Sequence, residues 1–171
     1  MSTKRNCPEK DVLPAAFLNG AKQYCDAADI LLSAARETVT SLDPVYMLYF
    51  HAAELALKAF LAFRGEKTKV LKTGFRHDLG KLYNQALVRG LAPEATHSQD
   101  IQNVISLLDS ANLNEALRYF TWRSRAMPEI TWAGEVVNQL IRLVENRIGY
   151  PLGESGPAVK GDLTIGRPIP K

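Results

Sequence analysis

The stretch LYFHAAELALKAFLAFRG, residues 48–65, decides the fold, because it is an almost unbroken run of Leu, Ala, Phe and Tyr. A helix that is apolar on nearly every side lies at the centre of a helical bundle. Its polar exceptions are His51, Glu54 and Lys58. At about 100° per residue they fall, together with Met47, in a sector of about 60°. The helix therefore carries one narrow polar stripe, which faces a groove, a subunit interface or polar partners on neighbouring helices.

Two interpretations of this polar stripe are open. Glu54 and Lys58 stand four residues apart in the order that favours an ion pair, and His51 would then be a hydrogen-bonded side chain at the edge of the core. Alternatively, His51 and Glu54 lie one turn apart and could exchange protons or hold a ligand in a partly dry groove. We expect packing to explain Glu54 and Lys58, and His51 is the stronger functional candidate. A buried stripe must be paired, because an unpaired buried charge costs several kcal/mol.

The rest of the chain also has a helical period, and the alternation typical of β-strands is nearly absent. Asp43 at the N-cap, Pro44 in the first turn and Gly65 after the last turn delimit the central helix. Ser98 is a second N-cap candidate. We predict an all-α, up-down bundle of about five or six helices over residues 13–149. The expected helices cover residues 14–40, 44–64, 78–90, 99–111, 113–120 and 131–149.

At 171 residues the chain has the size of one domain. The flanking residues 1–12 and the Gly- and Pro-rich residues 150–171 are expected to be flexible, and the latter could form an arm that packs on a partner chain. Cys7 and Cys25 lack metal-ligand spacing and favour a reducing compartment. No signal peptide is expected, and the charged stripe argues against a membrane span. We therefore expect a cytoplasmic protein without a cofactor or a metal.

The segment FRHDLGKLY, residues 75–83, is a second place where titratable residues gather. Asp78 is placed to cap the helix that begins there, and capping is its expected role. His77 is a candidate general base or hydrogen-bond acceptor. The loop before it is basic and could contact phosphate groups through Lys67, Lys69, Lys72 and Arg76.

The segment LRYFTWRSR, residues 117–125, interleaves three arginines with aromatic residues. In nucleic-acid-binding proteins such a mixture binds phosphate groups through arginines and stacks bases on aromatic rings. The candidate arginines are Arg118, Arg123 and Arg125. The alternative is that the aromatic rings pack in the core while the arginines are solvated or paired with acidic residues. The net charge of +3 permits contact with nucleic acid without arguing for it.

HAAELALKAFLAFRG from His51, followed by a basic loop, HDLGKLYNQAL from His77 and LRYF from Leu117, resembles the HEPN superfamily (higher eukaryotes and prokaryotes nucleotide-binding). The resemblance covers most of residues 15–148. It implies a small helical bundle that often dimerises, with a groove between helices that serves RNA or nucleotide chemistry. Many members are metal-independent RNases of toxin–antitoxin, phage-defence or CRISPR systems.

The active motif of those RNases is an Arg, a spacer of four to six residues and a His, and this chain departs from it. His97 is the last histidine, so none follows Arg118 or Arg123. The pair Arg89 and His97 has a spacer of seven residues and crosses the loop of residues 90–93. The departure is more typical of non-catalytic members, which bind nucleotides, nucleic acid or a partner protein.

The resemblance therefore implies a non-catalytic binding module, a homodimer, that takes RNA, a nucleotide or a partner protein. Its groove would be lined by His51, Glu54, Lys58, Arg76, His77, Arg118 and Arg123. One alternative is a metal-independent RNase of unusual layout, in which His51 or His77 is the general base and Arg118 or Arg123 stabilises the pentacovalent phosphate. Another is a pure protein-interaction subunit, such as an antitoxin, that docks through residues 150–171.

Overall fold

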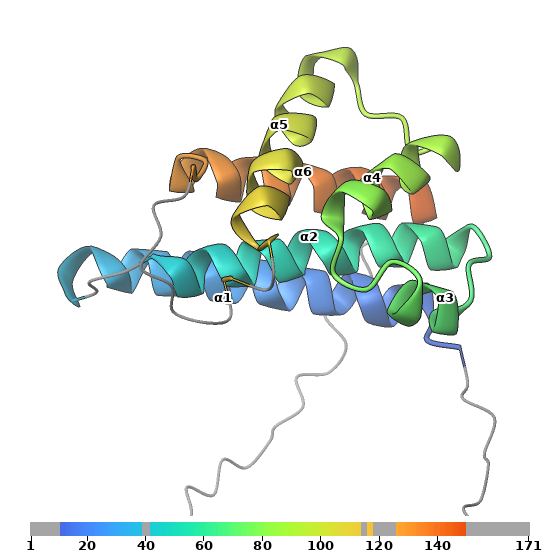
Figure 1. Ribbon diagram of the computed structural model, residues 1–171, viewed down its shortest axis with the longest axis horizontal. Coiled ribbons are helices and arrows are strands. Elements are labelled where there is room, and N and C mark those ends of the chain that lie inside the picture. The colour runs from blue at the N-terminus through green and yellow to red at the C-terminus, as the bar shows by residue number, and fades with distance from the viewer. Residues whose placement is uncertain (1–10, 39–41, 114–115, 118–125, 150–171) are drawn as a thin grey trace, which may run out of the picture.

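The computed structural model describes residues 11–38, 42–113, 116–117 and 126–149. Within these ranges the chain forms helices and no strand, so the prediction of an all-α bundle of five or six helices is confirmed. α1 and α2 run side by side along the longest axis, and α4, α5 and α6 pack over α2 (Figure 1). The helices are α1 (Pro14–Thr38), α2 (Asp43–Phe63), α3 (Thr68–Thr73), α4 (Leu79–Val88), α5 (Ala95–Ala111) and α6 (Ile130–Ile148).

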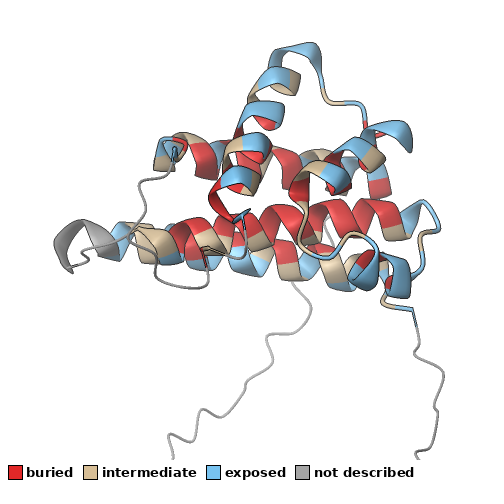
Figure 2. Ribbon diagram, viewed as in Figure 1, coloured by how far each residue is buried: buried red, intermediate tan, exposed pale blue. Residues whose placement is uncertain are grey.

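α2 is the central helix, as its apolar sequence predicts. It contacts α1, α3, α4, α5 and α6, and its buried residues form a continuous band through the molecule (Figure 2). Tyr49, Phe50, Leu57 and Leu61 on α2 are among the largest fully buried side chains. By length and composition α2 could cross a membrane, and it is the one such helix in the described ranges. However, 72% of its most apolar window is buried inside the bundle, as in the core helix of a soluble protein.

The start of α2 differs from the prediction, whereas its end agrees with it. The N-cap position is Leu42, which makes no side-chain capping bond, so the assignment of Asp43 as the N-cap is wrong by one residue. Pro44 lies in the first turn, where its missing N–H costs nothing. Gly65 follows α2 with φ +92°, a left-handed conformation that glycine adopts without strain.

Two other helix starts also differ from the prediction. α5 begins at Ala95, because Glu94 is extended and its carbonyl accepts from the N–H groups of His97 and Ser98; Ser98 therefore lies inside the helix and is not its cap. Part of the predicted basic loop is the short helix α3. Its first residue, Thr68, donates its N–H to Asp11 Oδ1 at 2.9 Å. The Thr68 hydroxyl oxygen accepts from the N–H of Val12 at 2.6 Å. These two bonds attach the end of the N-terminal segment to the bundle.

Several predicted features lie outside the described residues. They include most of the fifth helix expected over residues 113–120, both Arg118 and Arg123, and the flanking residues 1–10 and 150–171. The described bundle therefore ends at Gly149, which follows α6 with φ +68°.

Candidate functional site

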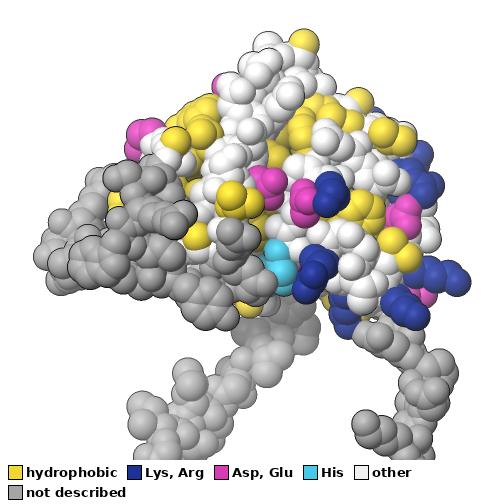
Figure 3. Space-filling model, in the orientation of Figure 1, with side chains coloured by type: hydrophobic (Ala, Val, Ile, Leu, Met, Phe, Trp, Pro, Cys, Tyr) yellow, Lys and Arg dark blue, Asp and Glu magenta, His cyan; other side chains and the backbone are white. Residues whose placement is uncertain are grey.

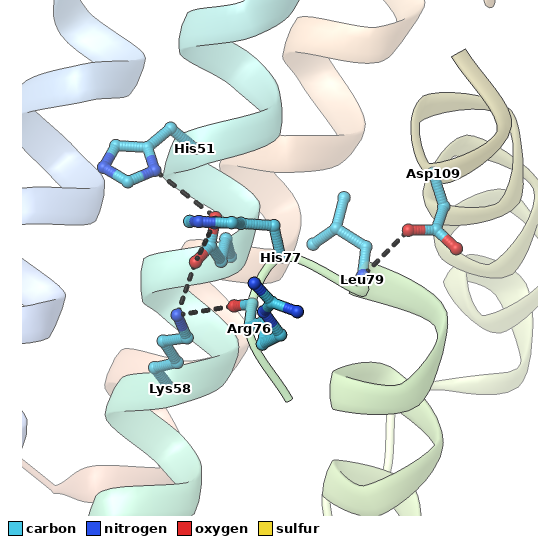
Figure 4. A network of polar contacts seen from close by, with 7 residues as sticks. His51, Lys58, Arg76, His77, Leu79 and Asp109 are labelled. Atoms are coloured by element: carbon cyan, nitrogen blue, oxygen red, sulfur yellow. Dashed lines mark hydrogen bonds and ion pairs between the residues drawn. The ribbon is translucent and has the colours of Figure 1, made fainter. Parts of the chain in front are cut away.

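The polar stripe of α2 is buried at its centre and reaches the surface at its edges. Glu54 is only 1% exposed, and its carboxylate accepts from three side chains. His51 Nδ1 lies 3.4 Å from Glu54 Oε2, and His77 Nδ1 lies 3.1 Å from both carboxylate oxygens of Glu54. Lys58 Nζ donates a hydrogen bond to Glu54 Oε1. The two histidine side chains are 26% and 37% exposed. Figure 4 shows His51, His77 and Lys58 meeting at this one carboxylate, which joins α2 to the start of α4.

The shared carboxylate determines which nitrogen of each imidazole carries hydrogen. Burial would raise the pKa of Glu54, but the bond from His51, the charge and bond of Lys58 and the bond from His77 outweigh it and lower the pKa to about 2. Glu54 is therefore ionised at neutral pH and can only accept hydrogen bonds. Both rings must then carry hydrogen on Nδ1, the nitrogen that faces Glu54.

Lys58 links the stripe to the segment before α4. It is 6% exposed and donates both to Glu54 and to the backbone carbonyl of Arg76 at 3.0 Å. Arg76 has φ +51°, an unusual conformation for a residue other than glycine, and this turn directs its carbonyl at Lys58. The predicted role of Arg76 was a side-chain role. The bond to Lys58 uses its backbone, while the residue itself is exposed.

The first turn of α4 holds His77 against Glu54. Asp78 caps this helix, as predicted, by accepting from Lys81 N at 2.8 Å. Asp109 on α5 accepts from Leu79 N at 2.9 Å, so a second carboxylate anchors the same turn (Figure 4). Burial raises the pKa of Asp109, and the charge of Asp78 adds to the effect. Asp109 was not among the predicted residues, because no local pattern connects it to a helix start 30 residues earlier.

An aromatic ring packs on His51, and basic side chains lie near histidine on the surface (Figure 3). The ring of Tyr24 on α1 meets His51 edge-on, with centroids 4.4 Å apart. Histidine is accessible next to Lys and Arg side chains on the face shown in Figure 3. Of the predicted phosphate contacts, Lys67, Lys69, Lys72 and Arg76 are all exposed, on α3 or beside it.

We predict that acid destabilises the protein through Glu54. Its pKa in the folded protein is lowered from 4.5 to about 2, so its contribution to stability is complete above pH 4.5 and is lost as the pH falls toward 2. Unfolding by urea in this range should take up as much as about one proton at Glu54. In the double variant Glu54→Leu/Lys58→Met this uptake should vanish, while the uptake by Asp78 and Glu129, whose pKa values are also lowered, remains. An unchanged pH dependence in the double variant would contradict the assignment.

The structure thus brings together five of the seven predicted site residues, namely His51, Glu54, Lys58, Arg76 and His77; Arg118 and Arg123 are outside the described ranges. Among the described residues, no group of three or more His, Cys, Asp or Glu side chains is arranged to hold a metal ion. No family model, no curated protein and no solved structure matches this chain.

Proposed function

We propose that this protein is a non-catalytic HEPN-like module that binds RNA through its phosphate groups at His51 and His77. One observation carries the proposal: two partly exposed imidazoles from different parts of the chain are anchored on one buried carboxylate. Anchoring fixes the rings without charging the site, because Glu54 and Lys58 neutralise each other. The resemblance of the stripe and of the His77 segment to the HEPN superfamily supports RNA or a nucleotide as the ligand.

The chemistry of phosphate binding follows from the orientation of the rings. When an imidazole takes up a proton at Nε2, that edge becomes a charged donor, and charged donors make the stronger bonds to phosphate oxygens. With both rings protonated, the site gains two positive charges that Glu54 and Lys58 do not cancel. The exposed Arg76 next to His77 adds a guanidinium, which suits phosphate geometry. Such contacts bind the backbone of RNA without reading its sequence.

The test is binding of a fluorescent single-stranded RNA by the full chain over a range of salt concentrations. The variant His51→Gln/His77→Gln should bind at least about tenfold more weakly, with a shallower salt dependence, because fewer counterions are released. His97→Gln on α5 is the matched control and should bind like the wild type. Equal affinity of the double variant and the wild type would refute the proposal. Competition between a mononucleotide and the fluorescent RNA shows whether a ligand with one phosphate group is enough for binding.

A second candidate function is a metal-independent endoribonuclease, and the same pair of rings favours it. RNA cleavage needs a general base and a general acid at one phosphate, and two imidazoles oriented through Nδ1 can fill both roles at Nε2. The same RNA, incubated with EDTA, distinguishes this function from binding alone. Cleavage that persists in EDTA and vanishes in His51→Gln/His77→Gln would establish the endoribonuclease. RNA that stays intact would support binding without cleavage. In either case we expect a homodimer, which the mass from light scattering tests.

A further inference from the structure

A second polar site lies on the side of α2 away from the histidines. Tyr49 and His51 are two residues apart, so their side chains leave the helix about 160° apart, on nearly opposite sides. Beside Tyr49 is a surface cavity of about 480 Å³ between α1, α2 and α6. The polar residues that line it include Asp29, Tyr49, Glu135, Asn138, Gln139 and Arg142. None of them belongs to the Glu54 network.

One wall of this cavity is built by a close fit between α2 and α6. The hydroxyl of the buried Tyr49 donates to Asp29 Oδ1 at 2.6 Å. It can do so because residue 134 is glycine: a Cβ there would lie 2.6 Å from the Tyr49 oxygen. The bond holds the carboxylate of Asp29 at the cavity and uses one of its two oxygens. The other oxygen remains for a cationic ligand.

The face of α6 toward the cavity carries polar groups that the described part of the chain leaves unsatisfied. Gln139 Oε1 is buried and has no hydrogen-bond partner there. A buried acceptor without a donor costs about 1–3 kcal/mol, and a ligand in the cavity can supply that donor once the Gln139 side chain turns its amide toward it. Glu135 and Arg142 make no ion pair with any described residue. Glu135, Gln139 and Arg142 follow one another at four- and three-residue steps, so they form one row about 10 Å long.

We propose that this cavity binds a free basic amino acid of the lysine or arginine type. The α-carboxylate pairs with the Arg142 guanidinium, and the α-ammonium donates to Gln139 Oε1 one turn away. The side chain lies along the row, and its cationic end meets Glu135 and Asp29. The charges match: the cavity offers two carboxylates and one guanidinium, and the ligand offers one carboxylate and two cationic groups.

The arrangement argues against simpler ligands. A dicarboxylate would place an anion beside Glu135 and Asp29, and like charges at that separation repel. A diamine would leave Arg142 without a counterion, and norleucine would leave the two carboxylates without one. Each of these ligands lacks one charged contact, and a hydrogen bond to a charged group contributes about 1.5–3 kcal/mol.

Titration calorimetry of the full chain with L-lysine and L-arginine, up to about 10 mM, tests the proposal. Saturable binding is expected for at least one of them, and at least about tenfold weaker binding for norleucine and cadaverine, which each lack one charged group. Glu135 and Arg142 are exposed, so the variants Glu135→Gln and Arg142→Gln should fold normally, which circular dichroism checks. Each variant should bind the amino acid at least about tenfold more weakly than the wild type.

The variant His51→Gln/His77→Gln is the control that separates this site from the RNA site. It should bind the amino acid as the wild type does, because its substitutions lie on the other side of α2. No saturable binding of either amino acid, or equal binding by Glu135→Gln, Arg142→Gln and the wild type, would overturn the proposal. Loss of RNA binding in the control with unchanged amino-acid binding would show that the two sites are independent.

Discussion

Glu54→Ala is expected to lower the free energy of unfolding by about 3–5 kcal/mol, the largest effect of any single substitution in the stripe. The reason is the position of Lys58, which is 6% exposed and whose ammonium would remain buried without its anion. The carbonyl of Arg76 would be its one remaining acceptor in the described chain. His77 would also lose the contact that ties the start of α4 to α2.

The matched control is the double variant Glu54→Leu/Lys58→Met, which removes both charges and fills the space with apolar groups of similar size. Replacing a whole buried pair in this way is often neutral or stabilising, so most of the loss should be recovered. Urea unfolding followed by circular dichroism measures both variants, with unchanged m-values as the sign of a pure stability effect. If Glu54→Ala is as stable as the wild type, the pair of Glu54 and Lys58 is not buried in solution.

Gly134→Ala is the second substitution with a large expected effect, a net loss of about 2–4 kcal/mol. An added Cβ would lie 2.6 Å from the oxygen and 2.8 Å from Cζ of Tyr49. The Tyr49 ring is 1% exposed and has little room to move away. Overpacking costs about 1–3 kcal/mol, and a displaced hydroxyl that loses Asp29 costs about 1–3 kcal/mol more. The better helix propensity of alanine returns only about 1 kcal/mol.

Gly20→Ala on α1 is the matched control for this prediction. Its Cβ would lie 3.1 Å from Leu55 Cδ1, the end of a partly exposed side chain that can shift. The gain in helix propensity should offset that shift, so the free energy of unfolding should stay within about 1 kcal/mol of the wild type. If both glycine variants lose equal stability, the close approach of Tyr49 to α6 is not what constrains residue 134.

The parts of the fold that could be predicted are those whose cause lies in a few neighbouring residues. The apolar run of α2, Pro44 in its first turn and Gly65 after its end determine that helix locally. α3 was missed because six residues are too few to show a period, and because its start depends on Asp11, 57 residues away from Thr68. Ser98 was the wrong start for α5 because Glu94, directly after Pro93, already turns the chain into the helix.

The candidate site divides in the same way. The common face of His51, Glu54 and Lys58 follows from helical geometry, and the sequence predicted it. The convergence of His77 on the same carboxylate depends on how α4 packs on α2 and on the positive φ of Arg76. Neither has a local sequence signal. The expectation that packing explains Glu54 and Lys58 fits their burial, while His51 and His77 are the members that reach the surface.

The most direct test of the central proposal is the ¹⁵N spectrum of the three histidines, recorded with and without single-stranded RNA. In the free protein, the Nδ1 of His51 and His77 should carry hydrogen whatever the charge of the ring, because both donate to Glu54. Added RNA should shift the Nε2 signals of these two residues and leave His97 unchanged. Hydrogen on Nε2 alone in both free rings, or an RNA titration that shifts neither signal, would contradict the account.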